Sequence, residues 1–234
     1  MPAERGHTSA PALDRTAQYL LTAAAGCVNA VGFLVLGGVF TSVMTANLAL
    51  LGLGLGGGHP GTARLAALTI VAYVTGVVLG GRAAAGIGRE PRRTGGLRAA
   101  LVAECALLWA VWVFWVSVGG EPGAAQRATL LAASSLAMGC QNGGVRVVTG
   151  GAETTAYMTG ALTGLVAEGV RTRRLDRHIA LTVVLIPVGA ALGGFAVRWA
   201  RLAAPALAAV LVTLALLAVV RAVPRRKRGP RPGA

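Results

Sequence analysis

The feature that most constrains the fold is that the two halves of the chain repeat each other. Three strings of the first half occur again in the second half. They are Gly-Cys-x-Asn (26–29 and 139–142), Thr-x-x-Met-Thr-x-x-Leu (41–48 and 155–162) and Gly-x-x-Leu-Gly-Gly (76–81 and 189–194). The offset is 113 residues for the first and third pairs and 114 for the second. An internal repeat in a multi-pass membrane protein is typical of transporter folds, whose polar sites lie where the repeats meet.

The composition places the chain among membrane proteins. Of its 234 residues 55% are hydrophobic and only 13% are charged, and the mean hydropathy is +0.66. The net charge of +14 is spread over short segments between apolar runs, which is typical of cytoplasmic loops rather than of a nucleic-acid-binding surface. The three cysteines lie inside apolar runs, so we expect no disulfide framework.

Eight apolar segments follow one another, at 17–36, 39–57, 65–86, 97–118, 128–149, 154–170, 178–198 and 204–222. The third, fourth, seventh and eighth are about 20 residues long and nearly free of charge, enough to cross a hydrocarbon core of roughly 30 Å. The second and sixth are shorter or broken by glycine, and they are rich in Thr, Asn and Gly. Such sequences occur at membrane depth where protein or a polar cavity surrounds them, so we expect broken or re-entrant helices there.

Arginine-rich loops predict the topology. The loops 87–98 and 171–177 and the C-terminal tail carry most of the arginines, and the positive-inside rule puts all three in the cytoplasm. If the second and sixth segments do not cross, six full spans remain, three in each repeat, and both termini are cytoplasmic. An odd number of spans inverts the second repeat relative to the first. One segment counted wrongly would instead make the repeats parallel.

The predicted fold is therefore an all-α polytopic protein of the bacterial cytoplasmic (inner) membrane, with about six transmembrane helices and two broken or re-entrant helices. It divides into a cytoplasmic N-terminal tail (1–15), a first membrane repeat (16–118), an external linker (119–127), a second membrane repeat (128–222) and a basic cytoplasmic C-terminal tail (223–234). Glycines four residues apart, Gly76 with Gly80 and Gly189 with Gly193, predict close helix packing on equivalent spans.

Several of these strings resemble the YoaK-like family of bacterial integral membrane proteins, known as domain of unknown function 1275. The resemblance covers roughly residues 15–222. It lies in five strings: Ala-Gly-Cys-Val-Asn-Ala-Val-Gly-Phe (25–33), Val-Phe followed by Met-Thr-Ala-Asn (39–47), Gly-Cys-Gln-Asn (139–142), Thr-Thr (154–155) and Met-Thr-Gly (158–160). The family more often has Asp where this chain has Asn29. The resemblance implies a multi-pass inner-membrane protein without an established activity.

Polar side chains inside the apolar segments are the candidate solute-binding residues, because unpaired amides in hydrocarbon cost several kcal/mol and must find partners or water. They lie at equivalent places in the two repeats: Asn29, Thr41, Thr45, Asn47, Gln141, Asn142, Thr155 and Thr159. If all of them line one pathway, we expect them to converge near the bilayer midplane. The alternative is that they only hold helices together through interhelical hydrogen bonds.

Glu104 is the acid deepest inside an apolar segment, in an otherwise uncharged run that holds three of the four tryptophans. An intramembrane acid indicates either a structural ion pair or a site that handles protons or cations. Arg146, one helical turn after Asn142, is the expected partner. The counterpart of Glu104 in the other repeat is Leu217, so the two halves do not share this carboxyl group.

The function that this pattern favours is a transporter or channel-like permease for an unknown small solute. The alternative is a non-transporting membrane scaffold or assembly factor. We expect no enzyme, no cofactor and no metal, since all three histidines fall in tails or loops. The expected partners are anionic lipid headgroups at the arginine-rich loops and tail, and no nucleic acid; a homo-oligomer is left open.

Overall fold

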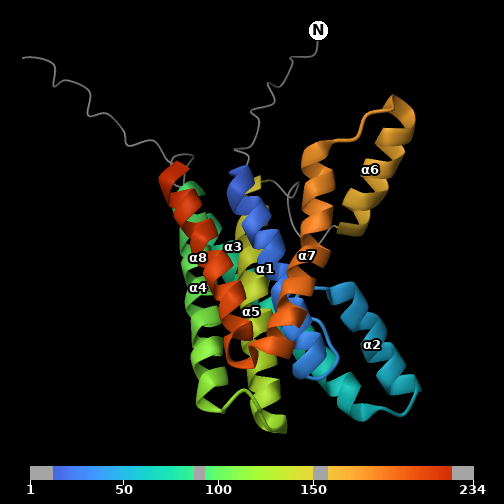
Figure 1. Cartoon of the computed structure of the whole chain (residues 1–234), viewed down its shortest axis with the longest axis vertical. Helices are drawn as coiled ribbons and strands as arrows, with labels where there is room; N and C mark the ends of the chain where they lie inside the picture. Colours follow the sequence, from blue (N-terminus) through green and yellow to red (C-terminus); the bar gives the residue numbers. More distant parts are fainter. Residues whose placement is uncertain (1–12, 87–92, 150–157, 223–234) are drawn as a thin grey trace, which may run out of the picture.

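The computed structural model describes residues 13–86, 93–149 and 158–222, and they form a bundle of α-helices without strands in the described part. The helices occupy the eight predicted segments (Figure 1): α1 Arg15–Val35, α2 Met44–Gly56, α3 Pro60–Gly86, α4 Arg93–Ser117, α5 Ala124–Thr149, α6 Met158–Thr172, α7 Arg177–Trp199 and α8 Ala204–Ala222, with a short 3-10 turn at Arg201–Ala203 before α8. Thr155 and most of both tails lie outside the described residues.

Local sequence signals fix where the helices begin and end. The Asp14 side chain accepts a hydrogen bond from the backbone N–H of Ala17 at the start of α1, and Asp176 accepts from two N–H groups at the start of α7. After α1 the chain reverses through Gly37 and Gly38, whose φ angles of 132° and 75° favour glycine. This reversal directs the segment before α2 back along α1.

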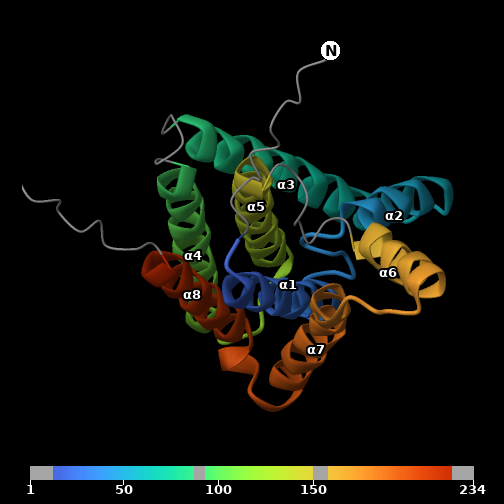
Figure 2. The ribbon, with the colours of Figure 1, turned by 90° about the horizontal axis from the view of Figure 1, so that it is seen from above.

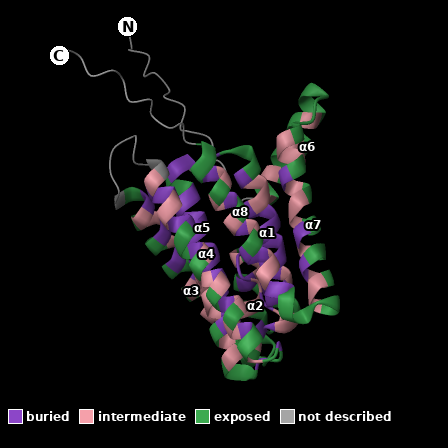
Figure 3. Ribbon diagram, turned by 60° about the vertical axis from the view of Figure 1, so that its left-hand side comes forward, coloured by how far each residue is buried: buried purple, intermediate pink, exposed green. Residues whose placement is uncertain are grey.

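Five helices are long and apolar enough to cross a membrane, namely those at 15–35, 60–85, 95–117, 177–199 and 201–222. α5 is equally long but more polar, and it lies between α1, α3 and α4 when the bundle is seen from above (Figure 2). Protein rather than lipid surrounds much of α5, which explains how it carries polar side chains. Figure 3 shows the contrast with α6, which has no buried residue.

The two helices at the polar segments are short. α2 has 13 residues and α6 has 15, so at 1.5 Å per residue each is roughly 20 Å long, less than a hydrocarbon core of roughly 30 Å. α2 packs against α3, and α6 packs against α7. Both lie at the side of the bundle rather than at its centre (Figures 1 and 2).

The arginine-rich ends of the helices lie together. In Figure 1 the start of α1, the start of α4, the start of α7 and the end of α8 are all at the top. Arg98, Arg177 and Arg221 belong to these ends. The described parts of the segments that the positive-inside rule assigns to one side of the membrane therefore lie at one end of the bundle.

Candidate functional site

Glycine contacts hold α1 and α5, the first helix of each half, against a helix of the other half. On α1 a Cβ at Gly26 would collide with the carbonyl oxygen of Ile186 on α7. On α5 a Cβ at Gly139 would collide with the carbonyl oxygen of Tyr73 on α3. Only glycine allows this backbone approach, so α1–α7 and α3–α5 are the two most closely packed helix pairs.

The partner helices contribute the predicted four-residue glycine motif in the same way. A Cβ at Gly189 would meet Ala23 O of α1, and one at Gly76 would meet Leu136 O of α5. The backbone of the cysteine in each Gly-Cys string lies against the next glycine of the motif, Cys27 against Gly193 and Cys140 against Gly80. Residues separated by 113 positions thus make matching contacts, and the predicted close packing of these helices is confirmed.

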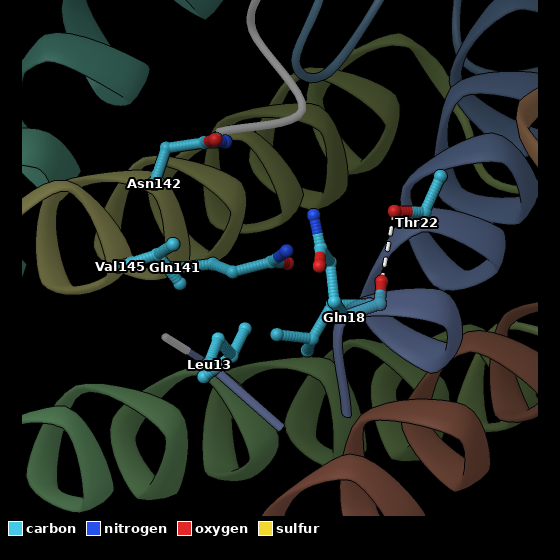
Figure 4. A pocket seen from close by; sticks show the side chains of 7 residues that line it. Leu13, Gln18, Thr22, Gln141, Asn142 and Val145 are labelled. Carbon is cyan, nitrogen blue, oxygen red and sulfur yellow. Dashed lines mark hydrogen bonds between the residues drawn. The ribbon is translucent and has the colours of Figure 1, made fainter. Parts of the chain in front are cut away.

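A small pocket lies where α1 and α5 approach each other, with about 220 Å³ of empty space including its open mouth. We call it the α1–α5 pocket, and its lining residues are Leu13, Gln18, Leu21, Thr22, Gln141, Asn142 and Val145. In Figure 4 the Gln141 side chain extends from α5 toward that of Gln18. Its polar groups among the described residues are amides and a hydroxyl, and none of the described side chains that line it is charged.

Two amide oxygens of this pocket have no hydrogen-bond partner among the described residues: Gln18 Oε1 and Gln141 Oε1. Gln141 is 2% exposed. A buried acceptor without a partner costs roughly 1–3 kcal/mol, so these oxygens are suited to accept a hydrogen bond from a solute or a water molecule. The Thr22 hydroxyl, by contrast, donates to the Gln18 carbonyl oxygen one turn earlier at 2.8 Å, and the Asn142 amide donates to Met138 O at 2.9 Å.

Asn29 lies in a different environment, because its side chain binds the backbone that leads into α2. Its Oδ1 accepts from the N–H groups of Thr41 and Ser42, both at 3.0 Å, and from the Thr41 hydroxyl at 3.1 Å. Its Nδ2 donates to the Ser42 hydroxyl at 2.8 Å. Asn29 is 9% exposed, and its oxygen is already shared by three donors. It therefore holds a loop rather than offering free polar atoms.

Asn47 holds the same loop from the other side. Its Oδ1 accepts from Phe40 N–H at 2.9 Å, and its Nδ2 donates to Phe40 O at 2.6 Å and to the Thr69 hydroxyl of α3 at 3.0 Å. The Thr69 hydroxyl in turn donates to Ala66 O. We call these bonds the Asn29–Asn47 network. They keep the backbone of residues 40–42 paired where no helix pairs it.

The structure thus divides the predicted solute-binding residues. Asn29, Thr41 and Asn47 belong to the Asn29–Asn47 network, whereas Gln141 and Asn142 line the α1–α5 pocket. Thr45 and Thr159, on α2 and α6, are exposed. The predicted residues are therefore not gathered around one described pocket.

Glu104 and Arg146 do not pair with each other. Glu104 is completely buried on α4, and neither of its carboxyl oxygens has a hydrogen-bond partner within the described ranges. Arg146 is exposed. The expected ion pair is wrong because Gly144, not Arg146, lies against α4 at Ala100, and a residue two positions further is about 200° around the helix.

Sequence reasoning missed Gln18, the pocket residue on α1. It lies near the cytoplasmic end expected for the first span, where a polar residue is unremarkable. A helical-wheel signal could have found it, because Gln18, Thr22 and Asn29 are spaced four and seven residues apart along one face. The described residues contain no group of three or more His, Cys, Asp or Glu that could hold a metal.

Comparison with known families decides the identity. The model of a family described as a protein of unknown function, DUF1275, matches residues 18–220. The chain belongs to the DUF1275 family. This confirms the resemblance in the Gly-Cys and Met-Thr strings. No curated protein and no solved structure matches this DUF1275 protein, so the family gives it a membrane fold but no activity.

Proposed function

We propose that this DUF1275 protein is a transporter or channel-like permease for a small, uncharged polar solute, and that the solute passes through the α1–α5 pocket. The observation that carries the proposal is the pair of unpartnered amide oxygens, Gln18 Oε1 and Gln141 Oε1, at one pocket. Side chains that only hold helices together would be hydrogen-bonded to those helices. A pocket without charged side chains suits a neutral donor of hydrogen bonds.

The relation between the two halves of the chain supports this proposal. α1 begins at the top of Figure 1 and α5 at the bottom, although their Gly-Cys-x-Asn strings match. If α1 to α4 are equivalent to α5 to α8 in that order, each helix contact has an equivalent contact. The contact α1–α7 corresponds to α3–α5, α2–α3 to α6–α7, and α1–α8 to α4–α5. These relations fit three crossing helices and one short helix per repeat, with α1 and α5 as equivalent helices.

The proposed orientation places the arginine-rich end, with both termini, in the cytoplasm. Arg98, Arg171 and Arg221 would then lie at the level of anionic headgroups. The α1–α5 pocket lies toward that same end, since Leu13 and Gln18 precede and begin α1.

The glycine-packed pairs suggest how the pocket opens. α1–α7 and α3–α5 are each held by backbone contact, while α1 and α5 contact each other much less. Two rigid pairs that rock against each other would widen or close the space between α1 and α5, as in other transporters built from repeats.

A scaffold is the second candidate function. The Asn29–Asn47 network favours it, because these amides are satisfied by protein atoms and need no solute. A scaffold of this kind would conduct no solute, so a transport assay separates the two.

The test is solute entry into liposomes that contain the purified protein, followed by stopped-flow light scattering with urea, formamide, glycerol and erythritol. We expect faster re-swelling than in empty liposomes for at least one of these solutes. The double variant Gln18→Leu and Gln141→Leu should lose that gain, while Thr75→Val, an exposed α3 hydroxyl bonded to its own helix, should keep it. Re-swelling equal to that of empty liposomes for the whole panel would favour the scaffold.

A further inference from the structure

Glu104 is the buried ionisable group that the proposed pathway leaves unused. It is 0% exposed in the middle of α4, and its two oxygens lack hydrogen-bond partners among the described residues. An ionised carboxylate in such a place costs several kcal/mol. The site therefore needs something that removes the negative charge.

Among the side chains that the structure describes, no cation of the surrounding helices serves this purpose. α4 packs against α3, α5 and α8, and the arginines of those helices are all exposed: Arg64, Arg82, Arg127, Arg146 and Arg221. On α4 itself, Arg98 donates to Val220 O. The other titratable side chains that the structure describes within these helices are Tyr73, Cys105 and Cys140, none of which is a cation.

The neighbours of Glu104 on its own helix are apolar. Ala100, Leu101 and Leu108 are buried on α4, and one turn before Glu104 the side chain of Ala100 lies against Gly144 of α5. Glu104 is also near enough to Cys140 of α5 to interact with it electrostatically. A metal cation such as Na⁺ or Ca²⁺ requires several oxygen ligands, and no hydrogen-bonding group of the described residues reaches the carboxyl oxygens, whereas a proton requires a single carboxyl oxygen.

We propose that Glu104 is a proton-binding site, and that the release and return of this proton is coupled to passage of the solute. The proton forms an O–H bond on one carboxyl oxygen and leaves the group neutral; its loss restores the buried carboxylate. The coupling rests on the proposed transport function, whereas proton binding does not.

Gln141 connects Glu104 with the pocket. On α5, Gln141 directly follows Cys140. Gly144, three residues further, faces α4. Val145, four residues further and therefore on the same side of α5 as Gln141, lines the pocket. The amide oxygen of Gln141 has no hydrogen-bond partner among the described residues. Gln141 thus directly follows in the chain the cysteine that interacts with Glu104, and through this segment of α5 a solute bound at Gln141 would change the environment of Glu104.

Infrared difference spectroscopy of the purified full chain in detergent tests proton binding. At neutral pH we expect the carbonyl stretch of a protonated carboxyl group, which shifts in D₂O. Glu104→Gln, which resembles the neutral acid in size and shape, should remove the band, and Glu121→Gln, at an exposed loop position, should retain it. Glu104→Asp keeps a carboxyl group and should retain the band at a shifted frequency. This variant tests the assignment if Glu104→Gln fails to fold. A folded wild type without the band, or a band that persists in Glu104→Gln, would overturn the assignment.

Proton flux into the same liposomes tests the coupling. For a solute that passes, a pH-sensitive dye inside the liposomes should report a proton signal that Glu104→Gln abolishes. An infrared band without solute entry would contradict the transport function and leave proton binding intact. Solute entry with an unchanged proton signal in Glu104→Gln would overturn the coupling.

Discussion

The matched strings of the two halves contain the amides of Asn29 and Gln141, and the oxygens of these two amides lie in different surroundings. The Asn29 side chain makes four hydrogen bonds to Thr41 and Ser42 and fixes the backbone before α2. Gln141 lines the α1–α5 pocket, and its amide oxygen has no hydrogen-bond partner among the described residues. One amide stabilises the fold, and the other contributes to a polar surface.

The comparison teaches that a polar residue inside a membrane protein is interpreted by its partners rather than by its position. Where protein donors saturate an amide, we expect substitution to change the free energy of unfolding. Where an acceptor has no protein partner, we expect substitution to change solute passage instead. Unfolding in detergent and solute entry into liposomes separate the two kinds of effect.

The largest stability loss is expected for Asn29→Leu. The substitution leaves two backbone N–H groups and a hydroxyl of Thr41 and Ser42 without their acceptor, which should cost about 3–5 kcal/mol. Chemical denaturation of the purified protein in mild detergent measures the change. Asn29→Asp is the matched control, because a carboxylate still accepts from all three donors; equal losses in both variants would refute the role of the acceptor.

Asn47→Leu is expected to lose slightly less, about 2–4 kcal/mol. Asn47 is completely buried, and the substitution leaves both backbone groups of Phe40 unpaired. The same denaturation experiment measures the change, with Thr69→Val as a milder variant that removes only the bond to α3. Unchanged stability in Asn47→Leu would mean that the loop before α2 does not depend on it.

A smaller loss, about 1 kcal/mol, is expected for Ser42→Ala. The hydroxyl accepts a single bond from Asn29 Nδ2, while the backbone N–H of Ser42 still donates to Asn29. A loss as large as that of Asn29→Leu would show that the serine, not the asparagine, holds the loop.

The smallest stability change is expected for Gln141→Met in the α1–α5 pocket, within about 1 kcal/mol, because the substitution removes an unpartnered acceptor and keeps the volume. Solute entry into liposomes should nevertheless fall to the rate of empty liposomes. If instead the protein unfolds and the remaining folded fraction transports normally, Gln141 belongs with the structural amides.

The sequence predicted the helices better than the partners of the polar groups. Hydrophobic length located all eight segments, and glycine content with polar residues marked α2 and α6 as short, because these properties act locally along the chain. The predicted packing of Gly76 and Gly189 followed from side-chain size alone.

The site was predicted only in part. Gln141 and Asn142 do line a pocket, but Asn29 and Asn47 bind a loop, since whether an amide is saturated depends on a backbone turn that periodicity does not encode. Arg146 was chosen as a partner for its distance along the chain. Its direction around α5 relative to Gly144, which the sequence does not give, turns it away from Glu104.

The glycine contacts also have a consequence for biosynthesis. α1 has its close partner in α7 and α3 has its own in α5, so neither half holds both members of a pair. When the ribosome has delivered the first four helices, α1 and α3 still expose glycine faces that no helix yet covers. The α3–α5 pair can therefore form only once α5 has been inserted and the α1–α7 pair only once α7 has been inserted, so the last helices complete the packing of the first.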